Sequence, residues 1–124
     1  MAADNPAHRV FERPSITSLV RTLSGCNVIQ RLDCWLATYR LGEYINLHRD
    51  ASGSMQIVAC MSAPHSTANG GYLLIEKTPV ILGIGDAVIF DATRLEHETT
   101  PLIATAGNKQ PQRIVLVARY YLQP

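Results

Sequence analysis

The chain lacks most of the features that would place it outside the ordinary globular proteins. Its longest apolar stretches are far shorter than the roughly 20 residues that cross a bilayer, and its first fifteen residues lack the apolar region of a secretory signal. The 11 Lys and Arg residues against 10 Asp and Glu give a net charge of +1, and the basic residues are scattered along the chain. We therefore expect no membrane segment, no nucleic-acid partner and a cytoplasmic location.

Cysteine is also scarce. The three cysteines, Cys26, Cys34 and Cys60, form no C-x-x-C pair, and because their number is odd, one would stay unpaired in any disulfide arrangement. This argues against a disulfide framework and predicts reduced thiols. Cys34 and Cys60 lie inside apolar stretches, where cysteine usually acts as a small core residue.

With 124 residues, 47% of them hydrophobic and 17% charged, the chain has room for one core of ordinary size. Residues 1–13 are polar and poorly patterned, and we expect a loose arm there. The following residues to Leu23 have helical spacing, with Ser15 as the expected cap and Ser24-Gly25 as the end. We divide the chain into an arm with one short helix (1–26) and a core (27–124).

From Asn27 onward, short runs rich in β-branched and aromatic residues alternate with turn sequences such as Ser52-Gly53 and Asn69-Gly70-Gly71. No helix of useful length lies between the runs, which excludes a βαβ arrangement. The pattern predicts an all-β fold, either a sandwich, a jelly roll or a barrel. The expected strands are NVIQRLDCWLATYR, YINLHRD, MQIVACMSA, GYLLIE, PVILG, DAVIF, EHETTPL and QRIVLVARYYL.

Within YINLHRD the residues Tyr44, Asn46, His48 and Asp50 should share one strand face. His-x-Asp then directs an imidazole and a carboxylate at one ion, and His97 from another strand is the natural third ligand. Two imidazoles and one carboxylate leave three octahedral positions open, which suits iron(II). A single His-x-Asp is more often an ordinary pair of side chains, so this motif alone is only a hypothesis.

The order of the surrounding motifs strengthens the hypothesis. YRLGEYINLHRD contains Tyr39 and a glycine ahead of the His-x-Asp, GGYLLIE begins at Gly70, PVILGIGDAVIF leads to His97, and QRIVLVARYYL begins beside Arg113. Together these segments resemble the 2-oxoglutarate and iron(II)-dependent dioxygenase superfamily, most closely its prolyl-4-hydroxylase-like branch, over roughly residues 37–122. The resemblance implies a double-stranded β-helix, that is, a jelly-roll barrel of two four-stranded sheets.

The same resemblance implies roles for particular residues. His48, Asp50 and His97 would bind iron(II) at the catalytic centre. Arg113 would pair with the far carboxylate of 2-oxoglutarate, with Arg119 as a reserve candidate that otherwise reads as a surface charge, and Tyr39 would hydrogen-bond the same carboxylate. The implied reaction consumes O2 and 2-oxoglutarate, releases succinate and CO2, and hydroxylates a small molecule such as an amino acid.

Two alternatives stay open. One is a cupin-type metalloenzyme that does not use 2-oxoglutarate, although cupins usually offer His-x-His rather than the His48-Arg49-Asp50 found here. The other is a non-catalytic jelly-roll binding module. Because only about 26 residues precede the first expected strand, little chain is left for a lid, and we hypothesise a homodimer that closes the site. Elsewhere, we expect Trp35 in the core and His65 in a solvated loop.

Overall fold

The computed structural model describes residues 5–52 and 54–123. Within these residues, two helices precede eight strands, and a single 3-10 turn, η2, follows the third strand. The elements are α1 (Pro6–Phe11), α2 (Pro14–Ser24), β1 (Val28–Tyr39), β2 (Ile45–His48), β3 (Ser54–Ser62), η2 (Thr67–Asn69), β4 (Leu73–Ile75), β5 (Thr78–Val80), β6 (Ala87–Asp91), β7 (His97–Thr99) and β8 (Arg113–Gln123).

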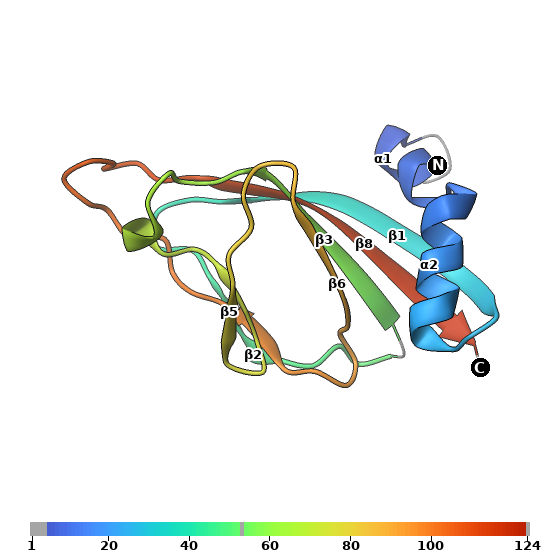
Figure 1. Cartoon of the computed structure of the whole chain (residues 1–124). Helices are drawn as coiled ribbons and strands as arrows, with labels where there is room; N and C mark the ends of the chain where they lie inside the picture. Colours follow the sequence, from blue (N-terminus) through green and yellow to red (C-terminus); the bar gives the residue numbers. More distant parts are fainter. Residues whose placement is uncertain (1–4, 53, 124) are drawn as a thin grey trace.

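The strands form two antiparallel four-stranded sheets with the orders β1-β8-β3-β6 and β2-β7-β4-β5. Figure 1 shows the long strands of the first sheet above the short strands of the second, with both helices at one end of the first sheet. β8 is an inner strand of the first sheet: it pairs with β1 from Val28↔Gln123 to Tyr39↔Arg113, and with β3 on its other side. The expected all-β architecture with a short helical segment at the N-terminal side is therefore present.

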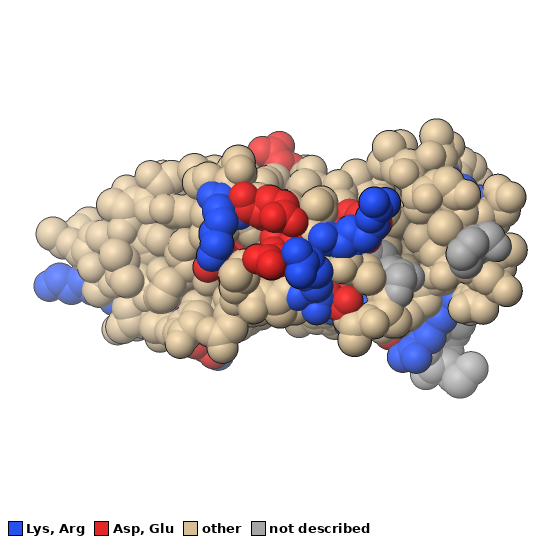
Figure 2. All heavy atoms as spheres, turned by 90° about the horizontal axis from the view of Figure 1, so that it is seen from below, with Lys and Arg blue, Asp and Glu red and all other residues tan. Residues whose placement is uncertain are grey.

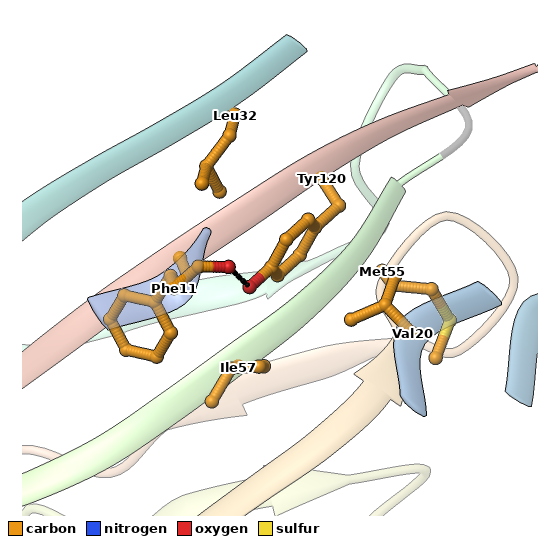
Figure 3. Close-up of a cluster of buried hydrophobic side chains, with 7 residues drawn as sticks. Phe11, Val20, Leu32, Met55, Ile57 and Tyr120 are labelled. Carbon is orange, nitrogen blue, oxygen red and sulfur yellow. Dashed lines mark hydrogen bonds between the residues drawn. The ribbon is translucent and has the colours of Figure 1, made fainter. Parts of the chain in front are cut away.

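Alternation along the long strands gives the first sheet two apolar faces. Leu32, Ile57 and Tyr120 face the helices and pack with Phe11 of α1 and Val20 of α2 (Figure 3). Residues of the opposite parity face the second sheet, and Val58, Phe90, Val115 and Val117 among them form a second cluster with Leu73 of β4. The helices thus cover the back of the sheet whose front forms the space between the two sheets.

The N-terminal residues correct one expectation. Residues 6–11 form α1 rather than a loose arm, because Asn5 accepts a hydrogen bond from the Ala7 N–H (2.9 Å) and Pro6 occupies the first turn. Phe11, only 5% exposed, attaches this short helix to the sheet. The second helix ends at Gly25 as predicted, with φ +73°, but its cap position is Arg13 rather than Ser15, since Pro14 already begins the helix.

A buried histidine also fastens α1. The Nε2 atom of His8 lies 2.8 Å from the Leu32 carbonyl of β1, and its Nδ1 atom lies 2.6 Å from Glu12 Oε1. Both partners are acceptors, so the ring satisfies both only when it carries two protons. Burial opposes the charge, but the hydrogen bonds to Glu12 and Leu32 outweigh it and raise the pKa of His8.

This contact makes the stability of the helical end depend on pH. A pKa that is raised on folding stabilises fully below the unfolded value of about 6.5, and the contribution is lost as the pH rises through the folded value. We expect the difference in unfolding free energy between wild type and His8→Gln to be larger at about pH 5.5 than at about pH 9. Urea unfolding at both pH values measures it, with His65→Gln in an exposed loop as the control. A difference that grows toward alkaline pH would contradict this assignment.

Tyr120 links the cluster between the helices and the first sheet to the backbone of α1. Its side chain is fully buried, and its hydroxyl donates a 2.6 Å hydrogen bond to the Phe11 carbonyl, the dashed line of Figure 3. Tyr120→Phe removes the donor and leaves the acceptor, which should cost roughly 1–3 kcal/mol of unfolding free energy. Tyr121→Phe, the same change one residue along β8, should cost less than about 0.5 kcal/mol, because the hydroxyl of the half-buried Tyr121 makes no hydrogen bond within the described residues and the ring is kept. Equal losses in the two variants, measured by urea unfolding, would refute the role of this hydrogen bond.

The outer side of the second sheet carries charges of both signs. Figure 2, the view from below, shows acidic side chains interleaved with basic ones. Two ion pairs of this region are Arg49–Glu96 (3.1 Å) and Lys77–Glu98 (3.2 Å). Neither helix of the described residues is long and apolar enough to cross a membrane.

Candidate functional site

A pocket opens between the two sheets, and it contains most of the polar residues that the sequence singled out. Its volume of about 120 Å³ is many times the ~15 Å³ that one water molecule needs by the same measure, so a small ligand fits. The polar residues that line it include Tyr39, His48, Gln56, His97, Arg113 and Arg119. Between them lie the apolar side chains of Val58, Leu73, Val115 and Val117.

Three potential metal ligands meet at this pocket. His48 ends β2, His97 begins β7, and Asp50 follows β2 by two residues; one ligand atom from each lies within 4.8 Å of the others. Asp50 Oδ1 is 3.5 Å from His48 Nε2 and 3.4 Å from His97 Nε2. The structure therefore brings together the three residues predicted as ligands, and their atoms could hold one metal ion.

A contact at Nδ1 orients the imidazole ring of each histidine. His48 Nδ1 lies 2.7 Å from the Asn46 carbonyl, and His97 Nδ1 lies 3.0 Å from the Leu95 carbonyl. A nitrogen that faces a carbonyl oxygen at this distance must carry the proton. The Nε2 lone pairs are then free to bind a cation, which is the arrangement commonly found around ligating histidines.

The path of β2 differs from the simple alternation expected. The pairing of β2 with β7 is irregular between Ile45 and His48, and Ile45 rather than Asn46 lines the pocket. Tyr44 and Asn46 are exposed and do not line the pocket. Asp50 is held beyond the strand instead, where its N–H donates to the Ala92 carbonyl at 2.8 Å.

The second oxygen of Asp50 faces the opposite sheet. Arg119 Nε lies 3.1 Å from Asp50 Oδ2, and the Gln56 amide donates to the same oxygen at 3.2 Å. The Nε–H of Arg119 does not point along the line to the oxygen, so this contact is a charge pair rather than a hydrogen bond. The Arg119 guanidinium also lies over the ring of Trp35, 5.1 Å from its centroid.

These contacts revise what the sequence suggested for two residues. Arg119, the reserve candidate for the cosubstrate carboxylate, is not a surface charge, because its position on β8 directs it inward next to the three potential metal ligands. Trp35 is half-buried and lines the pocket as well as packing against the core. Gln56 was not singled out, although it is the one polar side chain at the inward-facing positions of MQIVACM and could have been found by its parity.

Arg113 and Tyr39 form the other end of the pocket. They are register partners on β8 and β1, and the guanidinium carbon lies 5.4 Å from the Tyr39 ring centroid. Arg113 is only 6% exposed, and burial lowers its pKa against the opposing effects of Tyr39 and Cys60. Burial likewise raises the pKa of the Tyr39 hydroxyl, although the Arg113 charge acts against this, so the phenol is neutral at pH 7. Among residues 5–52 and 54–123, no carboxylate forms an ion pair with Arg113.

The comparisons with known proteins find likeness at the level of structure alone. No protein-family model matches the chain, and no curated protein matches it in sequence. A prolyl-4-hydroxylase from Pseudomonas putida superposes with a TM-score of 0.70 at 17% identity, over 88% of this chain and 62% of that one. A cupin protein from Bacteroides fragilis superposes with a TM-score of 0.53 at 12% identity, over 73% and 65%. The fold is of the cupin, or jelly-roll, type.

A third structural neighbour is a non-haem monooxygenase, ThoJ, in a complex with nickel. It superposes with a TM-score of 0.63 at 14% identity, over 92% of this chain and 52% of that one. The chain therefore spans about half to two thirds of the length of the two oxygenases that it resembles.

Metal binding can be tested directly on the three ligands. We expect wild type to bind one divalent ion and His97→Ala to bind it at least ~100-fold more weakly, since a lost ligand should cost more than the 10–100-fold of a lost outer partner. Anaerobic calorimetric titration with cobalt(II) measures the affinity. His65→Ala, which removes an exposed loop histidine, should bind like wild type. Equal binding by His97→Ala would exclude this site.

Proposed function

We propose that the chain is an iron(II) oxygenase that uses 2-oxoglutarate and that its two sheets form a double-stranded β-helix. The strand orders β1-β8-β3-β6 and β2-β7-β4-β5 support the fold, because consecutive strands mostly alternate between the two sheets. The observation that carries the function is the buried guanidinium of Arg113, which forms no ion pair with any carboxylate of the described residues and shares a pocket with His48 and His97, next to Asp50.

The donor set fits iron(II). Two imidazole nitrogens and one carboxylate oxygen lie within 4.8 Å of one another, and Asp50 Oδ1 lies about equally far from both Nε2 atoms. A site with this set and open positions is typical of non-haem iron(II) oxygenases. The remaining positions would be available to a bidentate cosubstrate and to dioxygen.

The far end of the pocket fits the other carboxylate of 2-oxoglutarate. A buried guanidinium without an anion is costly, and a carboxylate can meet it with two parallel hydrogen bonds. The neutral Tyr39 beside it is a further hydrogen-bond donor. Val115 and Val117 separate Arg113 from Arg119 on the inward face of β8, and such apolar walls suit the methylene carbons of the ligand.

When bound, iron(II) with 2-oxoglutarate would supply the chemistry that inserts one oxygen atom of O2 into a substrate C–H bond and the other into succinate, with loss of CO2. The residues of this chain would bind, orient and partly shield the reactants. A small molecule such as an amino acid remains the predicted substrate. The homodimer, the cytoplasmic location and the division of the chain at residues 26 and 27 stay predictions.

A cupin-type metalloenzyme without 2-oxoglutarate is the second candidate. The likeness to the Bacteroides fragilis cupin supports it, since cupins share the fold. It gives no reason for Arg113 to be buried unpaired beside Tyr39, which is why we rank it second. A binding module without catalysis would likewise leave the three converging metal ligands without a purpose.

Anaerobic titration with iron(II) and 2-oxoglutarate separates these candidates. We expect a weak visible charge-transfer band in wild type. Arg113→Met should need about 10–150-fold more 2-oxoglutarate, since it loses a charged hydrogen-bond partner worth about 1.5–3 kcal/mol. Its iron affinity should stay close to that of wild type, because Arg113 lies at the other end of the pocket.

Arg40→Met, at an exposed arginine, is the matched control and should titrate like wild type. Iron binding without any band on addition of 2-oxoglutarate would rule out the cosubstrate and move the cupin-type enzyme to first place. Absence of iron binding in folded wild type would favour the non-catalytic module.

A further inference from the structure

The carboxylate of Asp50 bridges the two sheets. Its Oδ1 faces the histidines of the β2-β7-β4-β5 sheet, and its Oδ2 faces Arg119 and Gln56 of the other sheet. Arg119 and Gln56 are register partners on β8 and β3, so neighbouring strands present a guanidinium charge and an amide donor side by side. The Asp50 side chain is only 5% exposed, and the two oxygens thus have different, fixed surroundings.

Whereas a histidine binds a metal ion through a single nitrogen, a carboxylate can coordinate the ion in more than one way. It can bind through one oxygen or through both, and rotation about its terminal bond exchanges the oxygens. A cationic group and an amide that engage one oxygen remove this freedom, since turning that oxygen to the ion would separate it from the positive charge and leave the amide N–H unpaired. Outer partners of this kind are known to orient ligands and to tune metal affinity.

We propose that Arg119 is a positioning residue for the metal site: with Gln56 it engages Asp50 Oδ2 and so presents Oδ1 alone to the ion. This inference rests on the proposed metal site, and it adds a function for a residue that binds neither the metal nor the cosubstrate in that proposal. Arg119 is itself held in place, because its guanidinium packs over Trp35 and its backbone pairs with two strands.

Orientation and charge predict opposite effects of removing Arg119. A positive charge beside a cation site repels the ion, so if charge alone counted, Arg119→Met would bind metal more tightly. If Arg119 positions Asp50, the variant should bind more weakly, by the 10–100-fold typical of a lost outer partner. The sign of the change therefore decides between the two effects.

The experiment is anaerobic cobalt(II) titration of the full chain, followed by calorimetry and by the visible spectrum of the bound ion. We expect Arg119→Met to bind about 10–100-fold more weakly than wild type. At saturating cobalt its visible bands should also change, since Asp50 can then coordinate through both oxygens, and a purely structural role would leave this spectrum unaltered. Arg119→Lys, which keeps the charge but not the planar guanidinium, should recover only part of the affinity.

Arg31→Met is the matched control. Arg31 also pairs with a carboxylate, that of Asp33 at 2.8 Å, and also lies over an aromatic ring, that of Tyr121 at 5.0 Å. It belongs to the same pair of strands but does not contact Asp50, so its loss should change cobalt affinity less than about twofold, as distant screened charges do.

Three results would overturn the inference: unchanged or tighter binding by Arg119→Met, an unaltered spectrum at saturation, or full recovery by Arg119→Lys. If Arg119→Met does not fold, as judged by its thermal transition, Gln56→Leu provides the same test, because it removes the other partner of Oδ2 and must also weaken binding. Failure of wild type to bind cobalt would refute the metal site itself, which is a different outcome from metal binding that ignores Arg119.

Discussion

The alternation of side chains along β1, β3 and β8 is the constraint on which the rest of the molecule depends. One parity of these strands packs against the helices, and the other lines the space between the sheets. On β8 the same register buries Tyr120 under α1 and sends Arg113 and Arg119 into the pocket. A slip of one residue would exchange the two faces, placing both guanidiniums against the helices. The fold and the site are therefore specified by a single register.

The two inward arginines of β8 show how position determines the chemistry of one residue type. Arg113 is deeply buried and forms no ion pair with a carboxylate of the described residues, and in the proposed function it would pair with an external anion. Arg119, six residues along, is compensated by Asp50 and packed on Trp35. The apolar side chains between them keep the two charges apart. The pocket thus has one charged end that is open to a ligand and one whose charge is already balanced by the protein.

Strand positions followed from the sequence because alternation and turn residues are local signals, and each of the eight expected segments overlaps one strand of the structure, although PVILG shares only two residues with β5. The convergence of His48, Asp50 and His97 was also foreseeable, from spacing and resemblance. α1 was missed because six residues carry little periodicity and its stability comes from packing of Phe11 and His8. The contact of Asp50 with Arg119 joins residues far apart in the chain, and the contact with Gln56 joins two different sheets. The irregular pairing of β2 with β7 means that strict alternation does not predict which side chains of β2 line the pocket. Such features depend on tertiary geometry that no local pattern encodes.

The inner position of β8 has a consequence for the nascent protein. β1 is the first strand to be synthesised and β8 the last of the eight, and their pairing joins residues as distant as Gln30 and Gln123. Contacts of such long sequence separation form slowly, and a chain emerging from the ribosome folds from its N-terminal side. A polypeptide that ends before Arg113 already contains His48, Asp50 and His97. It lacks β8, which joins β1 to β3, and therefore also lacks both arginines of the pocket. The binding site can therefore exist only after translation has passed the final strand.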